Sequence, residues 1–136
     1  MSVSVVYEIG ESAFANSNVV SVVIPDSVTY IGHGAFSDCR DLVSVTIGSG
    51  MTGIGSEAFS SCTELTSITF PESVTSIGGV AFYRCIALTS VTFENTEGWS
   101  VSSSSGTSLP NGVLSDPSLA AEYLTASYSG YYWIRG

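Results

Sequence analysis

Three cysteines and a single histidine are the residues of this chain best suited to metal or redox chemistry. Cys39, Cys62 and Cys85 are each 23 residues apart, and His33 lies six residues before the first of them. Zinc is held by thiolates and imidazoles in a tetrahedral arrangement. Because His33 lies at a different point of the 23-residue spacing, the sequence predicts no metal site. The spacing instead predicts a column of buried thiols, since free cysteine packs as a small apolar side chain.

A disulfide between neighbouring cysteines is the alternative to this buried column. Equivalent residues of stacked units lie close enough, yet their side chains point in the same direction rather than toward one another. The three cysteines would also leave one unpaired. We therefore expect three reduced thiols that react slowly, because burial in apolar surroundings raises the pKa of a thiol.

Other side chains that often serve in catalysis follow a repeat and do not converge on one site. The positions equivalent to His33 hold Glu11, Ser56 and Gly79, a variability that is typical of an exposed loop. Serine recurs in every unit, and neither a Gly-x-Ser-x-Gly turn nor a phosphate-binding loop occurs in the sequence. We predict that the protein is not an enzyme and has no catalytic residues, cofactor or metal.

A repeated motif sets the spacing of all these residues. Ile-Gly-x-x-Ala-Phe occurs four times, beginning at Ile9, Ile31, Ile54 and Ile77. The full unit continues as x-x-Cys-x-x-Leu-x-Ser-Val/Ile-Thr-Ile/Phe-Pro-x-Ser-Val-Thr, and residues 54–76 give its clearest copy. A fixed period of this length predicts a solenoid of stacked units. We expect about four coils of 23 residues.

Local patterns predict the shape of each coil. Alternating segments rich in β-branched residues indicate half-buried strands at 21–24, 44–47, 67–70 and 90–93. Second short strands are predicted within 28–31, 51–54 and 74–77. The glycine after each Ile is expected to adopt a positive φ. The Ala-Phe-x-x-Cys-x-x-Leu stretch predicts one or two helical turns.

Stacking of equivalent positions predicts the core. The aromatic column should be buried and consist of Phe14, Phe36, Phe59 and Phe82. An aliphatic column beside it should consist of Val19, Leu42, Leu65 and Leu88. The inward strand residues should be Val22, Ile24, Val45, Ile47, Ile68, Phe70, Val91 and Phe93.

The outward strand residues form our candidate binding face, here named the Ser/Thr face. Its members are Ser21, Val23, Ser44, Thr46, Ser67, Thr69, Ser90 and Thr92. Threonine suits exposed positions of a strand, and equivalent hydroxyls line up across neighbouring strands. A flat polar surface of this kind tolerates many partners.

The unit resembles the BspA-like leucine-rich repeat, or leucine-rich repeat family 5, of bacterial cell-surface proteins. The resemblance covers roughly residues 3–93 and depends on Gly, Ala-Phe, Cys, Leu and Pro-x-Ser-Val recurring in this order. It implies a leucine-rich-repeat-like solenoid of short parallel strands and short helical turns. It also implies an extracellular or surface-anchored adhesion protein that binds host or bacterial proteins. The tail resembles segments that close such arrays in gut bacteria.

The period ends near residue 93, so we divide the chain into a solenoid at 1–93 and a capping segment at 94–136, within one structural domain. The tail should hold a loop at 100–112, a helix from Asp116-Pro117 to about Ser127, and a strand at 131–135. The helix should bury Leu119, Ala120, Tyr123 and Leu124. Because solenoids need covered ends, a mixed α/β cap is the first interpretation. The alternative is an aromatic patch for carbohydrate or peptide, formed by Trp99, Tyr128, Tyr131, Tyr132 and Trp133.

Composition limits the classes of partner. The chain has 136 residues and a net charge of −9, so nucleic acid and anionic membranes are unfavourable partners. No apolar stretch is long enough to span a membrane. The scattered carboxylates indicate solubility, with a basic partner or Ca²⁺ as the alternative. The start MSVSVVYEIG lacks the features of a signal peptide, so we expect either a piece of a longer protein or a short natural chain.

The N-terminal end is expected to be the weak end of the solenoid. The first unit is one residue short, has no cysteine, and leaves Val3, Val5, Val6 and Ile9 near solvent. Such an uncovered edge invites pairing with another chain. We therefore predict self-association through this end or further repeats upstream. The predicted function is that of a protein-interaction module, with a carbohydrate-binding module as the alternative.

Overall fold

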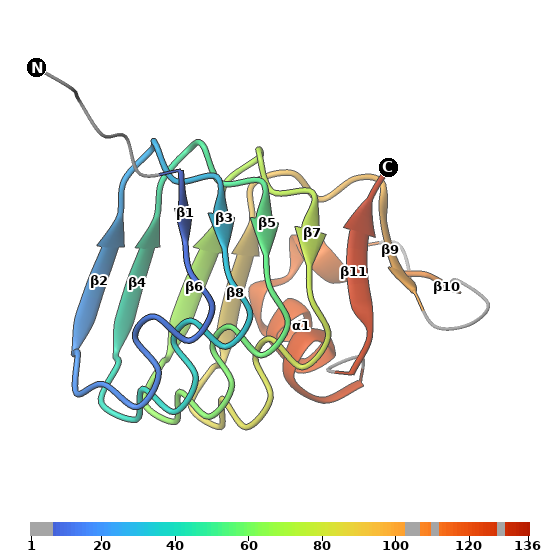
Figure 1. Ribbon diagram of the computed structural model, residues 1–136. Helices are drawn as coiled ribbons and strands as arrows, with labels where there is room; N and C mark the ends of the chain where they lie inside the picture. Colours follow the sequence, from blue (N-terminus) through green and yellow to red (C-terminus); the bar gives the residue numbers. More distant parts are fainter. Residues whose placement is uncertain (1–6, 103–106, 110–111, 128–129) are drawn as a thin grey trace, which may run out of the picture.

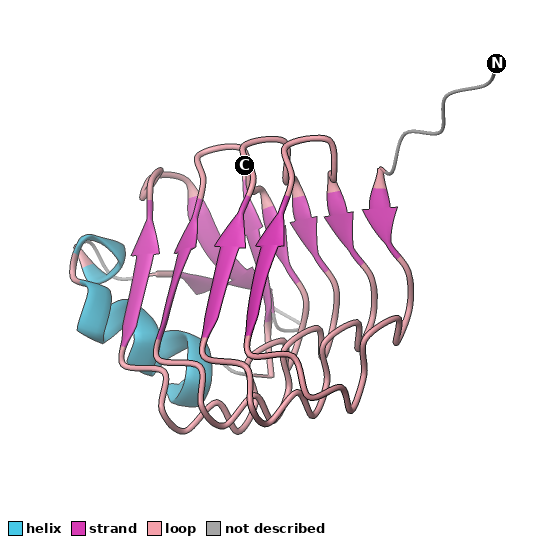
Figure 2. Cartoon of the chain, turned by 90° about the vertical axis from the view of Figure 1, so that its left-hand side faces the viewer, coloured by secondary structure: helices cyan, strands magenta, loops and turns pink. Residues whose placement is uncertain are grey.

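The computed structural model describes residues 7–102, 107–109, 112–127 and 130–136. The chain forms a solenoid in which two sheets, built from parallel repeat strands, face each other across a continuous core (Figure 1). The repeat strands of one sheet run opposite to those of the other, and the helix lies at one end of the stack while the first described coil lies at the other (Figure 2). This confirms the predicted repeat solenoid.

One sheet consists of the four longer strands, in the order β2 (Ser21–Ile24), β4 (Ser44–Ile47), β6 (Ser67–Phe70) and β8 (Ser90–Phe93). All of its pairs are parallel, and the four strands have the predicted bounds. Their inward residues are buried except Val22 and Ile47, which are half-buried. Strands β4 and β6 pair only at Ser44 and Ser67.

The short β4–β6 pairing has a cause in the sequence. Pro71 follows β6 where Gly48 follows β4, and proline has no N–H to donate to the neighbouring strand. Gly48 itself packs tightly on the first coil, because a Cβ there would lie 2.6 Å from the carbonyl carbon of Pro25. The first two coils therefore lie close together at the corner where the chain leaves these strands. The second and third coils are less closely paired there.

The second sheet begins with four strands that have two residues each: β1 (Glu8–Ile9), β3 (Tyr30–Ile31), β5 (Gly53–Ile54) and β7 (Ser76–Ile77). They are parallel and shorter than the predicted segments. The sheet continues with antiparallel strands from the tail, in the order β11 (Tyr132–Arg135), β9 (Trp99–Ser102) and β10 (Thr107–Ser108).

The segment between the two sheets forms consecutive turns, which differ from the helical turns that we expected. In the second coil, for example, Ala35 N–H donates to Gly32 O of the same coil at 3.1 Å. Phe36 N–H donates instead to Ala58 O of the next coil at 2.8 Å. Two positions per coil have positive φ, such as 52° at Val80 and 60° at Arg84. The alternation directs every second N–H toward the next coil, so bonds between coils replace those of a helix.

The prediction of positive φ at the glycine after each Ile is wrong. These glycines have ordinary φ values, and their role is close packing between coils. A Cβ at Gly32 would lie 2.7 Å from Ile9 O, and one at Gly78 would lie 2.3 Å from Ser56 N. Gly10, which has no coil before it in the described residues, would meet nothing within 4 Å.

The predicted aromatic column exists, with one correction. Ring centroids of successive members are 5.3, 5.3 and 5.2 Å apart, from Phe14 through Phe36 and Phe59 to Phe82. Three rings are buried, but Phe14 is 49% exposed, since none of the described residues forms a coil over its outer side. In the aliphatic column Leu42, Leu65 and Leu88 are buried, and Val19 is half-buried.

The tail closes the opposite end of the core. After a 3₁₀ turn at Val113–Ser115, α1 (Pro117–Glu122) is capped by Asp116, whose carboxylate accepts from the N–H groups of Ser118 and Leu119. A π-helical turn follows at Tyr123–Ser127. Ala120 and Leu124 are buried as predicted, but Leu119 is 40% exposed. Part of the predicted loop at 100–112 is in fact strand, since β9 extends into it and β10 lies within it.

Candidate functional site

The thiol column is a structural feature of the coil interfaces. Each cysteine donates its S–H to the carbonyl of the phenylalanine in the preceding coil, with Sγ–O distances of 3.1, 3.1 and 3.0 Å from Cys39, Cys62 and Cys85. All three are buried and free of disulfides. Burial raises the pKa of Cys85 to about 12 and raises the pKa of Cys62 as well, where the neighbouring thiols add to the effect. Within the described ranges no cluster of potential ligands could hold a metal ion.

The Ser/Thr face lies on the outer side of the β2–β8 sheet. Its serines are exposed except Ser90, which is half-buried, and Val23, Thr46, Thr69 and Thr92 are exposed. The alternation of the strands places none of its members in the core. At the separated corner of β4 and β6, a cleft of about 240 Å³ opens beside Thr46, Thr69 and Pro71. The face therefore has the geometry that the sequence predicted, with one shallow irregularity.

The proposed aromatic patch of the tail needs a correction. Trp133 is 1% exposed and its ring stacks on Phe93 with centroids 6.0 Å apart, while Trp99 is 6% exposed. Trp99 Nε1 donates to Asn95 O at 2.9 Å. Both tryptophans therefore form the covering layer over the last coil and are not an exposed surface. Tyr131 and Tyr132 are exposed, and Tyr128 lies outside the described residues.

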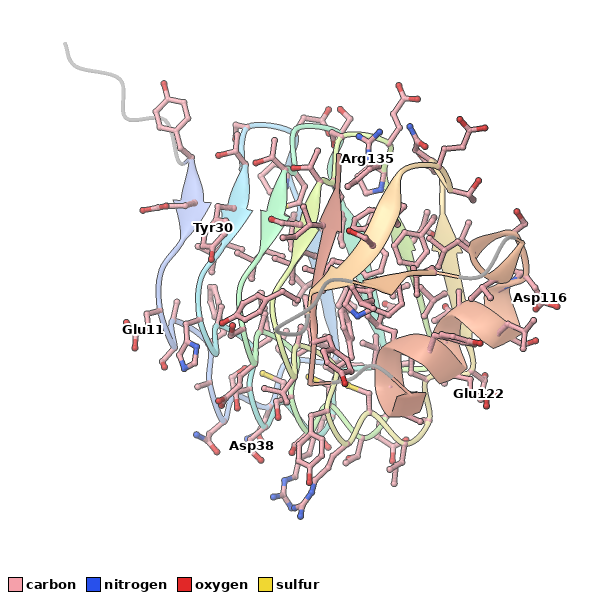
Figure 3. The ribbon with its side chains drawn as sticks, turned by 90° about the vertical axis from the view of Figure 1, so that its right-hand side faces the viewer. Glu11, Tyr30, Asp38, Asp116, Glu122 and Arg135 are labelled. Carbon is pink, nitrogen blue, oxygen red and sulfur yellow. The ribbon has the colours of Figure 1, made fainter. Side chains whose placement is uncertain are left out.

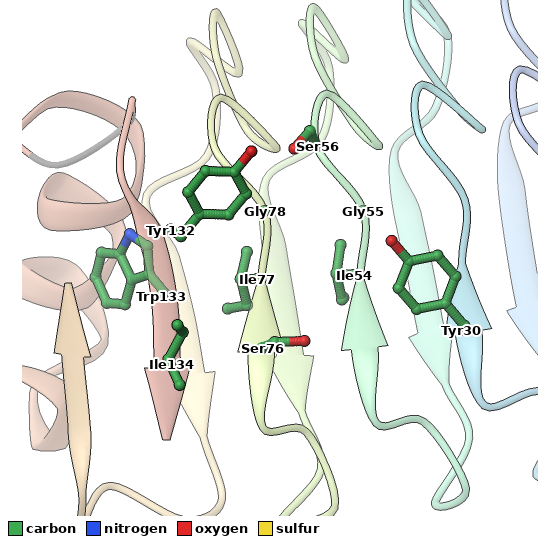
Figure 4. A pocket seen from close by; sticks show the side chains of 10 residues that line it. All are labelled: Tyr30, Ile54, Gly55, Ser56, Ser76, Ile77, Gly78, Tyr132, Trp133 and Ile134. Carbon is green, nitrogen blue, oxygen red and sulfur yellow. The ribbon is translucent and has the colours of Figure 1, made fainter. Parts of the chain in front are cut away.

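A cleft on the outer side of the other sheet brings two tyrosines to one site. We name it the tyrosine cleft; it has a volume of about 190 Å³, and Figure 4 shows the ten side chains that line it. Tyr30 of β3 and Tyr132 of β11 stand on opposite sides, with β5 and β7 between them (Figure 4). Ile54, Ser56, Ser76 and Ile134 lie between or beside the rings, along with Gly55, Ile77, Gly78 and Trp133.

Sequence reasoning missed Tyr30 as a site residue. Its position in the repeat holds Glu8, Gly53 and Ser76 in the other coils, so the pattern marks it only as outward-facing. The partner ring comes from β11, which pairs with β7 through Trp133–Ile77 and Ile134–Ser76. That antiparallel pairing is not part of the repeat, so no periodic signal in the sequence predicts the cleft.

The N-terminal end of the core forms a cleft of about 440 Å³, which we name the open end. It is lined mainly by apolar residues of the first coil, including Ile9, Phe14, Val22 and Val28. The predicted contributions of Val3, Val5 and Val6 lie outside the described residues.

Acidic side chains project from the outside of the fold at separate places, as Glu11, Asp38, Asp116 and Glu122 do in Figure 3. Asp38 pairs with Arg40 at 3.3 Å, and both groups are solvent-accessible. Arg135 instead ties the tail to the solenoid, because its guanidinium donates to the carbonyls of Glu72 and Val74 at 2.7 and 3.3 Å. No helix among the described residues has the length and apolar character to cross a membrane.

Comparison with known proteins assigns the family. The sequence profile of the BspA type leucine rich repeat region matches residues 6–115, so the chain belongs to the family of BspA-type leucine-rich repeat proteins. The match extends beyond the boundary at residue 93 where the visible period ends. No curated protein matches the chain.

Several solved structures have the same fold. A leucine-rich repeat protein from Bacteroides capillosus is 37% identical with a TM-score of 0.61, over 65% of this chain and 64% of that one. A leucine-rich cell surface protein from Faecalibacterium prausnitzii is 34% identical with a TM-score of 0.62, over 71% and 27%. The pneumococcal vaccine antigen PcpA is 32% identical with a TM-score of 0.62, over 71% and 24%. The chain thus spans less than two thirds of each of these proteins.

Proposed function

We propose that this chain is a non-catalytic, adhesion-type protein-binding module of a bacterial surface or secreted protein, and that the Ser/Thr face is its binding surface. The observation that carries the proposal is an uncharged outward surface, mostly of serine and threonine side chains, across four parallel strands. Similarity to a cell surface protein and to a vaccine antigen supports the extracellular setting. The repeat family is typically non-catalytic.

The size of the face bounds the affinity. Four strands at a spacing of about 4.8 Å and four residues at about 3.3 Å give a surface of roughly 19 by 13 Å. This is well below the roughly 800 Å² that each partner buries in a standard interface. A stable complex must therefore also use neighbouring residues, among which Val20 and Val43 are exposed at the strand entrances. The net charge of −9 favours a neutral or basic partner.

A matched pair of arginine substitutions tests this surface. We expect that a panel of purified extracellular-matrix and bacterial surface proteins contains a binder. Thr69→Arg should weaken its binding at least tenfold, because the new side chain stands in the centre of the face. The control Ile86→Arg adds the same charge at a residue that is 80% exposed in the segment between the sheets. Equal binding by both variants would contradict the assignment of the face.

The open end supports a second use of the chain, in self-association. Its apolar lining is of the kind that two copies could bury against each other. Sedimentation of the purified chain should show a dimer that Phe14→Arg dissociates, whereas Ile86→Arg should leave it intact. A monomer at all concentrations would contradict self-association and leave the proposal for the Ser/Thr face unaffected.

A further inference from the structure

We propose that the tyrosine cleft is a carbohydrate site that takes one or two rings of a neutral sugar. The site is separate from the Ser/Thr face, because the cleft lies on the outer side of the β3–β11 sheet whereas that face lies on the β2–β8 sheet. The two sites can therefore be tested independently. Four features of the cleft support a sugar as its occupant.

The walls are two exposed aromatic rings. Tyr30 is 41% exposed and Tyr132 is 55% exposed, a large exposure for rings that flank one cleft. Figure 4 shows the two hydroxyls directed toward the region of Ser56 between them. A tyrosine combines an apolar ring face with a polar hydroxyl. A sugar ring matches this combination, since it has an apolar C–H face and a rim of hydroxyl groups.

A glycine fixes the position of the first wall. A Cβ on Gly53 would lie 2.9 Å from Cδ2 of Tyr30 and 3.1 Å from Cε2, so the Tyr30 ring occupies the space that any other residue would fill. The ring therefore leans across β5 toward the cleft. Such preorganisation lowers the entropic cost of binding a ligand.

The floor offers hydroxyl groups that have no internal partner. Ser56 and Ser76 are half-buried and line the cleft, and among the described residues neither hydroxyl makes a hydrogen bond. A serine hydroxyl donates one hydrogen bond and accepts others, as a sugar hydroxyl does. Gly55 and Gly78 contribute only backbone, which leaves room above them. Ligand sites typically have this mixture of aromatic walls and a few polar groups.

Charge and size narrow the occupant further. None of the ten lining residues carries a carboxylate, guanidinium or ammonium group, and the chain has a net charge of −9. An anionic sugar would therefore find no counter-charge here. Strands β3 and β11 are three strand spacings apart in the sheet, roughly 14 Å, and Tyr30 narrows this gap. A cleft of about 190 Å³ is suited to a short glycan and not to a helix or a protein domain.

Titration with defined sugars tests the proposal. The probes are maltose, cellobiose, chitobiose, lactose and mannobiose with their trisaccharides, and binding is measured by calorimetry and by saturation-transfer NMR on the full chain. We expect at least one probe to bind. Tyr30→Ala and Tyr132→Ala should each weaken binding at least tenfold, and Ser76→Ala should weaken it less. Tyr30→Phe, which keeps the ring face, should retain more binding than Tyr30→Ala.

The control is Tyr83→Ala, because Tyr83 is 44% exposed but lies outside the cleft. Melting curves establish that each variant is folded, and binding of a protein partner at the Ser/Thr face should not change in Tyr30→Ala. Failure of every neutral sugar to bind would overturn the proposal. So would equal losses in Tyr83→Ala and Tyr30→Ala, or binding of a proline-rich peptide at the two tyrosines in place of any sugar.

Discussion

The two ends of this solenoid contain the same kinds of residue in opposite environments. At the C-terminal end, Phe93 is covered by Trp133, and both rings are buried. At the N-terminal end, Phe14 stacks on Phe36 on one side only and is 49% exposed. The repeat supplies an inward-facing ring in both places, but burial needs a neighbour on each side. The core of a solenoid is therefore a property of the interfaces between coils, as expected when each unit contacts only its neighbours.

The largest effect should come from truncating a ring in the middle of the column. Phe59→Ala should lower the free energy of unfolding by about 3–5 kcal/mol, the cost of removing a fully buried phenylalanine. Phe14→Ala should cost only about 1–2 kcal/mol, because half of that ring already faces solvent. Urea denaturation of both variants measures the difference. Equal losses in the free energy of unfolding would contradict the proposed difference between the centre and the end of the column.

A smaller but still large effect is expected when the C-terminal cover is removed. Trp133→Ala should cost about 3 kcal/mol, since the indole ring is 1% exposed and packs on Phe93. The neighbouring residue on β11 gives the control, because Tyr132 is 55% exposed and its truncation should change stability by less than about 1 kcal/mol. If Trp133→Ala and Tyr132→Ala have the same melting temperature, Trp133 does not cover the core as we describe.

The thiols of the inner coils should make stability depend on alkaline pH. The pKa values of Cys62 and Cys85 are raised in the folded chain, mainly by burial. The unfolded thiols ionise near pH 8.5, whereas the folded ones stay protonated, so the unfolded state binds fewer protons above that pH. The free energy of unfolding is therefore unaffected by these thiols below about pH 8.5 and falls above it. The largest slope is about 1.4 kcal/mol per pH unit for each thiol.

Urea titrations at pH 7.5 and 9.5 measure this loss, and the double variant Cys62→Ala, Cys85→Ala provides the control. The double variant should be less stable at neutral pH, because it lacks the two hydrogen bonds from thiols to backbone carbonyls. Its stability should be nearly the same at both pH values. The same slope in both proteins would assign the pH dependence to other groups.

The repeat predicted those parts of the fold that depend on period alone. The four strands β2, β4, β6 and β8, the stacked phenylalanines and the buried cysteines follow from equivalent positions that recur every 22 or 23 residues. The outward direction of the Ser/Thr face follows from the alternation within each strand. These features need only local pattern and stacking.

The parts that sequence reasoning missed depend on contacts outside the repeat. Phe14 is exposed because no second described ring packs on it, and the burial of Trp99 and Trp133 depends on how the tail folds back over Phe93. The regular spacing of the glycines suggested a turn, but their close contact with the backbone of the preceding coil explains it. The tyrosine cleft arises only when β11 pairs with β7, which places Tyr30 and Tyr132, about 100 residues apart in sequence, on opposite sides of one cleft.

Amide hydrogen exchange resolved by residue tests the central claim most directly, namely that each coil is stabilised by its neighbours. Protection should rise along the chain, with the fastest exchange in the first coil up to about residue 20 and the slowest between about 60 and 95, where coils and tail cover both sides. The N–H of Phe36 and that of Phe59, which bond equivalent carbonyls of the next coil, should exchange more slowly than that of Phe14. An N-terminal coil as well protected as the centre in a monomeric chain would contradict the account.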